Sequence, residues 1–66
     1  MENIAKVGDI VITQNKDEYR ILEVHSESGY LIVQPNAYYK IKIEAGKEMI
    51  HKSELINKGG YWEHLG

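Results

Sequence analysis

The amino-acid sequence predicts a single all-β domain, a small barrel of five or six short antiparallel strands. Where a pattern is visible, apolar and polar residues alternate with period two, which is typical of half-buried strands. Four polar or glycine-containing breaks separate these stretches at close spacing, and no stretch shows a helical period. Short, closely spaced strands favour a barrel or a sandwich, and 66 residues accommodate only the smallest barrels.

The first three predicted strands are residues 10–13, 19–24 and 30–34. The first and third are apolar nearly throughout, as in strands covered on both faces. The second alternates less strictly, and we expect Leu22 and Val24 to face inward, with Tyr19 and Ile21 on the opposite face.

The clearest alternation is YKIKIE at residues 39–44. It predicts a strand whose apolar residues Tyr39, Ile41 and Ile43 face the core while the charged residues face water. Residues 36–46 exceed what a minimal five-stranded barrel needs. They form either an added strand or a lengthened hairpin.

The chain after residue 47 predicts the closure of the barrel. Ser53 suits a single 3₁₀ turn near residues 52–55, which delivers Leu55 and Ile56 into a short final strand. We therefore expect residues 1–58 to form one barrel domain. Two glycines then release residues 59–66 as a C-terminal tail, either docked or flexible.

Composition limits what this domain can do. A chain of this size buries only about 60% of the surface that its unfolded form exposes, so the core is thin. The sequence has no cysteine, which excludes disulfides and thiolate zinc sites. Neither a signal-peptide pattern nor an apolar run of membrane-spanning length is visible, so we expect a cytoplasmic protein without membrane contact.

Charge argues against a general polyanion binder. The net charge is −2, with three basic and six acidic side chains in residues 1–34 and five basic and four acidic in residues 35–66. Phosphate binding depends on several clustered basic side chains, so any nucleic-acid site would have to be local. Seven lysines against one arginine hint at AT-rich codons and a low-GC bacterium or its phage.

Three segments together resemble a known fold family. They are the opening Val7-Gly8-Asp9-Ile10-Val11, the central YRILEV at 19–24 and the terminal MIHKSELI at 49–56. Together they resemble small bacterial or phage Src-homology-3-like barrels, a group that includes KOW and Tudor relatives. The resemblance covers about residues 7–57. It implies a strand, one 3₁₀ turn and a short closing strand at the end. It does not imply a function, because such barrels bind proteins, RNA, DNA and small ligands. The acidic-aromatic opening of eukaryotic peptide-binding members is absent, so no proline-rich-peptide groove is implied.

The sequence offers little for catalysis or metal binding. Candidate nucleophile and base pairs are Ser26 or Ser28 with His25, and Ser53 with His51, all in predicted turns. A very small barrel has little room for an oxyanion site or a water-excluding pocket. His51 with Glu54, and Glu63 with His64, fall short of the three or four ligands of a stable zinc site. We expect no enzymatic activity, no cofactor and no metal.

A strip of basic residues carries the nucleic-acid hypothesis. If residues 39–44 form a strand, one basic surface beside Tyr38 would comprise Lys40, Lys42, Lys47, His51 and Lys52. Lysines beside an aromatic ring are what a single-stranded nucleic acid requires. Glutamates occur at similar positions, however, and cross-strand Lys–Glu pairs on an ordinary solvated sheet explain the same residues.

Aromatic residues carry the preferred hypothesis, a noncatalytic module that binds another protein. Tyr38, Tyr61 and Trp62 are the candidate contacts, since tyrosine and tryptophan dominate interface hot spots. Alternatively, the tail folds back and Trp62 caps an open end of the barrel. Such a module would suit a small regulator or inhibitor, and pairing of a free strand edge could produce a dimer.

Overall fold

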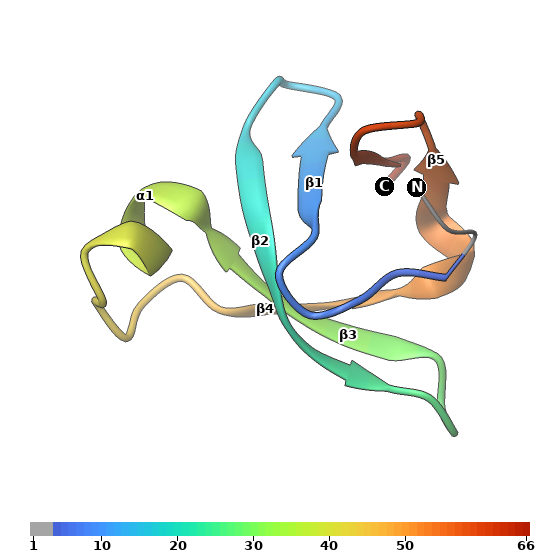
Figure 1. Ribbon diagram of the computed structural model, residues 1–66, viewed down its shortest axis with the longest axis horizontal. Coiled ribbons are helices and arrows are strands. Elements are labelled where there is room, and N and C mark those ends of the chain that lie inside the picture. Colours follow the sequence, from blue (N-terminus) through green and yellow to red (C-terminus); the bar gives the residue numbers. More distant parts are fainter. Residues whose placement is uncertain (1–3) are drawn as a thin grey trace.

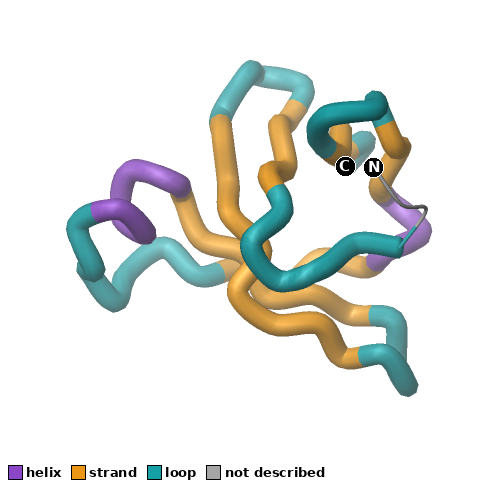
Figure 2. Tube along the Cα trace, viewed as in Figure 1, coloured by secondary structure: helices purple, strands orange, loops and turns teal. Residues whose placement is uncertain are grey.

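The computed structural model describes residues 4–66, which form one strongly curled, six-stranded sheet with two short helical turns (Figures 1 and 2). The elements are β1 Ile10–Thr13, β2 Glu18–His25, β3 Tyr30–Pro35, α1 Asn36–Lys40, β4 Glu48–His51, the 3₁₀ turn η1 Lys52–Glu54, β5 Leu55–Asn57 and β6 Trp62–His64. The sheet order is β4-β3-β2-β1-β6-β5. The predicted all-β class and the small Src-homology-3-like barrel are confirmed, with the barrel open between β4 and β5. Within residues 4–66, neither helical turn is long and apolar enough to cross a membrane.

The strand pairing differs from the prediction at one place. Strands β1 to β4 form an antiparallel meander, and β5 pairs antiparallel with β6. The pairing of β1 with β6 is parallel, with Val11 opposite Trp62. The prediction of antiparallel strands throughout is therefore wrong. The reason is that the chain reverses after β5, so the last strand inserts between β5 and β1 rather than ending the sheet.

The core lies on the inner face of the curled sheet. Its buried members come from four strands: Val11, Ile21, Leu31, Val33 and Trp62. Trp62 belongs to residues 59–66, and its side chain is only 5% exposed. The C-terminal segment is thus docked and contributes to the core.

Strand β2 faces the core differently from the prediction. Ile21 is fully buried, whereas Leu22 is half-buried on the other side of the sheet. A β-bulge between Ile21 and Glu23 adds one residue to β2, which shifts the alternation. Because of this shift, Ile21 and Val24 both pack against the core. The inward prediction is correct for Val24 and wrong for Leu22.

The strand predicted at residues 39–44 does not exist. The segment begins as α1, and Ile41 and Ile43 are 64% and 44% exposed instead of buried. Asn36 anchors the start, because its side chain accepts a hydrogen bond from Arg20 Nε (3.1 Å) and donates one to Glu18 (2.7 Å). The backbone then turns through a positive φ at Lys42, which an extended strand does not adopt. Of the two alternatives, the lengthened hairpin is correct, since this segment joins the antiparallel neighbours β3 and β4.

The 3₁₀ turn is present where the sequence predicts it. The side chain of His51 accepts a hydrogen bond from the backbone N–H of Ser53, and the Glu54 carboxylate accepts one from the backbone N–H of His51. This reciprocal cap starts η1 and directs the chain into β5, where Leu55 packs against the core.

Candidate functional site

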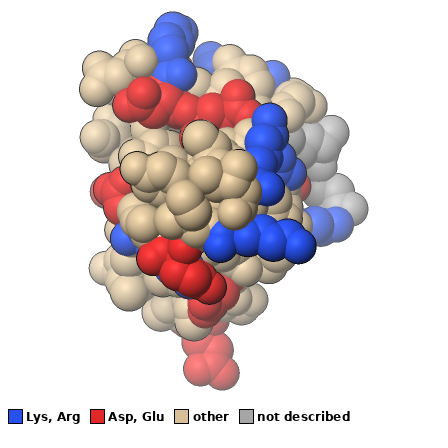
Figure 3. Space-filling model, turned by 90° about the vertical axis from the view of Figure 1, so that its left-hand side faces the viewer, with Lys and Arg blue, Asp and Glu red and all other residues tan. Residues whose placement is uncertain are grey.

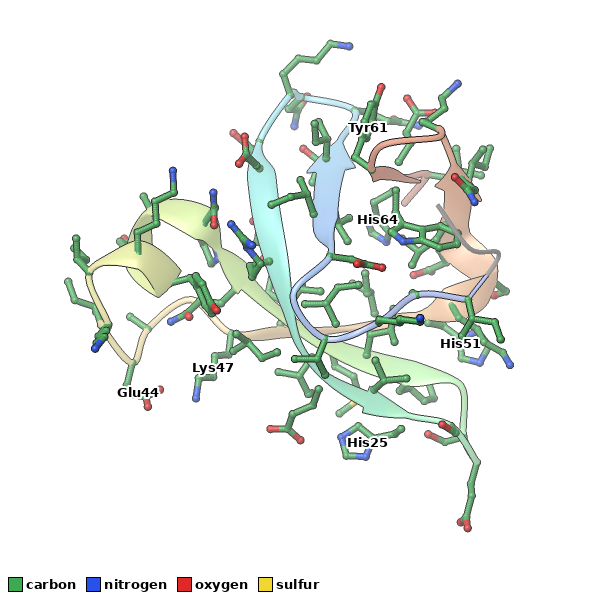
Figure 4. The ribbon with its side chains drawn as sticks, viewed as in Figure 1. His25, Glu44, Lys47, His51, Tyr61 and His64 are labelled. Carbon is green, nitrogen blue, oxygen red and sulfur yellow. The ribbon has the colours of Figure 1, made fainter. Side chains whose placement is uncertain are left out.

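The three aromatic residues predicted as partner contacts do not share one surface. Trp62 lies in the core, and its Nε1–H donates to Asp9 Oδ2 at 3.1 Å. Its side chain is therefore unavailable as an exposed anchor, in line with the alternative in which the tail folds back. Tyr61 is half-buried at the turn before β6, whereas Tyr38 is 40% exposed on α1, across the molecule (Figure 4).

The predicted basic strip is divided into two groups. Lys40 ends α1, and Lys42 and Lys47 lie in the connection between α1 and β4, whereas His51 ends β4 and Lys52 begins η1. Figure 4 shows Lys47 and His51 well apart. Four strand residues span about 13 Å. Lys47 also pairs with Glu44, at 2.6 Å between Nζ and Oε2. The strip depended on a strand at residues 39–44, which is absent, and the length of β4 separates its two groups.

Exposed apolar side chains gather where the sequence predicted a buried strand. Ten large apolar residues are exposed among residues 4–66, and five of them lie between residues 38 and 49. We refer to these five as the α1 patch: Tyr38, Tyr39, Ile41, Ile43 and Met49. Only Tyr38 was a predicted site residue. The sequence predicts the break at residues 34–37, but no local signal there indicates that the residues after it are exposed.

A buried glutamine holds this patch against the sheet. Gln34 is 4% exposed, and its Nε2 donates to the carbonyl oxygens of Ile43 and Ala45, the latter at 2.9 Å. The N–H of Ile43 donates to the carbonyl of Tyr38 at 3.0 Å. Two hydrogen bonds from Gln34 therefore fix the loop on the outer face of β3, and a third joins the loop to α1.

The patch continues onto the outer face of the strands. Met49 lies opposite Ile32 in the β3–β4 pair, and Ile32 is two residues from Gln34 along β3, about 7 Å. Ile43 lies over Gln34, where both line a shallow groove with Leu22. Exposed apolar side chains thus occur on α1, on the loop after it and on β4, with Lys42, Glu44 and Lys47 lining the same groove as Ile43.

The charge around the patch differs from that of the whole chain. Residues 36–47 contain Lys40, Lys42 and Lys47 and one acid, Glu44, which gives +2, whereas the chain carries −2. Figure 3 views this side of the molecule and shows an uncharged centre, lysines along one edge and acidic groups above and below. Tyr39 also stacks on the Arg20 guanidinium, whose carbon lies 4.9 Å from the ring centroid.

The serine and histidine pairs form structural contacts. His51 Nδ1 lies 2.8 Å from Ser53 Oγ and 3.2 Å from the Ser53 backbone nitrogen. Since a backbone N–H only donates, Nδ1 accepts and Nε2 carries the proton that it donates to the Ser28 carbonyl at 3.1 Å. Both ring nitrogens of His51 are thus occupied by hydrogen bonds to Ser28 and Ser53. Ser28 Oγ donates to the carbonyl of His25 rather than to its ring.

The acidic and histidine side chains near the C-terminus pair with one another. His64 Nε2 lies 3.1 Å from Glu54 Oε1, which also accepts from the His51 N–H. These hydrogen bonds, that of His64 first, hold the pKa of Glu54 below its ordinary value. In residues 4–66, no three His, Asp or Glu side chains are grouped so that they could hold a metal ion.

The free strand edges are short. Lys52 N–H donates to the Gly29 carbonyl at 2.8 Å, so the antiparallel alternation turns the backbone groups of Met49 and His51 toward the open edge of β4. The Glu54 carboxylate occupies the N–H of His51. Little of this edge is left for pairing with a second chain.

The chain matches no protein-family model, no curated protein and no solved structure. Its likeness to Src-homology-3-like barrels is one of architecture, carried by the curled meander and the 3₁₀ turn before the closing strands. Function therefore has to be inferred from the side chains themselves.

Proposed function

We propose that this protein is a noncatalytic, cytoplasmic protein-binding module whose contact surface is the α1 patch. The observation that carries the proposal is the concentration of exposed apolar side chains between residues 38 and 49. Scattered apolar residues on a surface are ordinary, but a contiguous apolar patch with a polar rim marks a site of interaction. Tyrosine and methionine, three of the five patch residues, are enriched at protein interfaces.

The chemistry of the patch defines the partner. An apolar centre formed by Ile41, Ile43 and Met49 calls for apolar side chains on the partner. The lysines along one edge of the patch, which make residues 36–47 net positive, call for acidic side chains on the partner opposite that edge. Complementary charge of this kind speeds association and selects among partners. The partner is therefore a protein surface with an apolar centre and acidic side chains opposite the lysine edge of the patch.

Nucleic-acid binding is the second candidate. It is favoured by the exposed rings of Tyr38 and Tyr39 beside Lys40 and Lys42, a combination that stacks bases and contacts phosphate. Lys47 is paired with Glu44, and His51 and Lys52 lie at the far end of β4. A nucleic acid at the two tyrosines would therefore meet fewer cations than the sequence predicts. For these reasons it ranks second.

Site-specific photo-crosslinking in host cells tests the proposal. A photoreactive residue replaces Ile41 in one variant and Ile56 in a matched control, since Ile56 is 41% exposed on β5, outside the patch. The Ile41 variant should capture a discrete protein, identified by mass spectrometry. Binding of that purified protein should weaken at least tenfold in Ile43→Asp and stay unchanged in Ile56→Asp.

Two results would contradict the proposal. One is capture of the same proteins from positions 41 and 56. The other is capture of nucleic acid instead of protein, with binding of mixed oligonucleotides that falls steeply with salt and is lost in a Lys40→Glu, Lys42→Glu variant. That second result would support the rival function.

A further inference from the structure

A groove at the far end of the half-barrel from α1 has the form of a small-ligand site. It has a volume of about 400 Å³ and lies between the β2–β3 turn, η1 and the N-terminal segment. This volume falls within the range of about 300–1,000 Å³ that ligand sites in proteins occupy. The groove shares no residue with the α1 patch, so a ligand site there is independent of the proposed function.

The floor of the groove is apolar and reaches the core. Val24, Leu31, Leu55 and Trp62 line it, and Leu31 and Trp62 are themselves buried core residues. The polar atom of the indole is already bonded to Asp9, so Trp62 has no unpaired hydrogen-bonding group to offer there. Among the described residues, no buried side-chain polar atom is left without a partner. The body of a ligand in this groove must therefore be apolar.

The rim supplies one unpaired cation. Lys52 lines the groove beside Ser26 and Gly29, and its Nζ forms no ion pair or hydrogen bond with residues 4–66. By contrast, Lys47 and Lys58 are paired with Glu44 and Glu63. His25 also lines the rim, where its ring is paired with Glu23. An ammonium group above an apolar floor complements a ligand that has an anionic head and an apolar tail.

We propose that this groove binds a small carboxylic acid with an apolar body, its carboxylate at Lys52 and its tail against Leu31, Leu55 and Trp62. The single carboxylate matches the single free ammonium. Burial of the tail supplies most of the affinity, and the exposed ion pair orients the acid. Octanoate has this chemistry and serves as the probe.

Fluorescence titration tests the site directly. Trp62 is the only tryptophan of the chain and forms part of the floor, so its emission reports occupancy. Octanoate below its micelle concentration should give a saturable change. From butanoate to hexanoate to octanoate, affinity should rise by up to about fourfold for each buried methylene. Octan-1-ol, which lacks the charge, should bind about two- to fivefold more weakly than octanoate.

Two lysine variants test whether Lys52 binds the carboxylate of the ligand. Lys52→Gln should weaken octanoate binding by about two- to fivefold without changing octanol binding. Lys58→Gln is the matched control, because Lys58 is exposed and lies outside the groove. Both lysines are exposed, so both variants should fold, which thermal unfolding verifies.

Amide chemical shifts locate the ligand. Octanoate should shift Ser26, Gly29 and Leu55 and leave Ile41 and Ile43 of the α1 patch unmoved. The proposal is wrong if the titration does not saturate, if octanol binds as tightly as octanoate, if the two lysine variants behave alike, or if the shifts concentrate on the α1 patch.

Discussion

The imidazole of His51 lies against the backbone of Gly29, so that a Cβ atom at position 29 would come within 2.8 Å of His51 Nε2. That nitrogen donates to the carbonyl of the neighbouring Ser28. Gly29 also has φ of +82°, a conformation that side chains rarely adopt. The turn between β2 and β3 therefore packs directly against the cap of η1 at this contact.

A graded set of glycine substitutions tests this contact. Gly29→Ala should lower the free energy of unfolding by about 1–3 kcal/mol, because it adds both backbone strain and a clash with the ring. Gly59→Ala carries the strain alone, since φ is +92° and no atom lies within 4 Å of the added Cβ. Gly60→Ala carries neither and should change stability by less than about 0.5 kcal/mol. Urea unfolding measures all three, and equal losses for Gly29 and Gly59 would show that the ring contact does not matter.

The lowered pKa of Glu54 predicts a dependence of stability on pH. The hydrogen bond from His64 and that from the His51 N–H favour the ionised carboxylate in the folded state. The pKa of Glu54 is lower in the folded state than the unfolded value of about 4.5, so ionised Glu54 stabilises the fold. This stabilisation is fully present above pH 4.5 and is lost as the pH falls through the folded pKa. Wild type should therefore be more stable than Glu54→Gln at pH 6, and the difference should shrink as the pH falls below about 4.5.

The control for this pH effect is Glu27→Gln, in the exposed turn between β2 and β3. The free energy of unfolding of Glu27→Gln should equal that of wild type at every pH from 6 to 3. A constant difference between wild type and Glu54→Gln from pH 6 to pH 3 would mean that ionisation of Glu54 is not the cause.

The burial of Trp62 predicts that the C-terminal segment is essential to the fold. Trp62→Ala removes a core side chain and should cost about 3–5 kcal/mol. For 66 residues the whole stability is on the order of 3–10 kcal/mol. Trp62→Ala should therefore be largely unfolded at 37 °C by circular dichroism, whereas the exposed control Tyr38→Ala should stay folded. A cooperative melt of Trp62→Ala near that of wild type would show that the tail is dispensable.

Much of the fold was predictable because period-two patterns and turn residues are local signals. They located β1, β2, β3 and the 3₁₀ turn. The bulge in β2 was not predictable, since Ile21 and Leu22 are both apolar and either could face the core. Ile21→Ala should cost about 2–5 kcal/mol and Leu22→Ala clearly less, a difference that thermal unfolding of the two variants measures.

The candidate site was less predictable than the fold, because tertiary contacts decide it. Residues 39–44 alternate like a strand, yet Asn36 is held by Arg20 and Glu18, which lie 16 and 18 positions away. Nothing local to the alternating residues signals those contacts. The alternation therefore predicts Ile41 and Ile43 in the core, whereas the hydrogen bonds of Asn36 and Gln34 hold the segment so that both side chains are exposed in the α1 patch.

Gln34 links the stability of the α1 patch to its proposed function. Gln34→Leu keeps the approximate size of the side chain and removes the donor to the carbonyl oxygens of Ile43 and Ala45. Leaving these groups without their donor should cost about 1–3 kcal/mol. The amide of Ile43 should then exchange with deuterium faster, because the loop is no longer held on β3, and binding of the crosslinked partner should weaken. Gln14→Leu is the matched control, since exposed Gln14 donates only to the Leu65 carbonyl. If Gln34→Leu accelerates exchange at Ile43 but leaves partner binding unchanged, the ordered loop is not part of the binding surface.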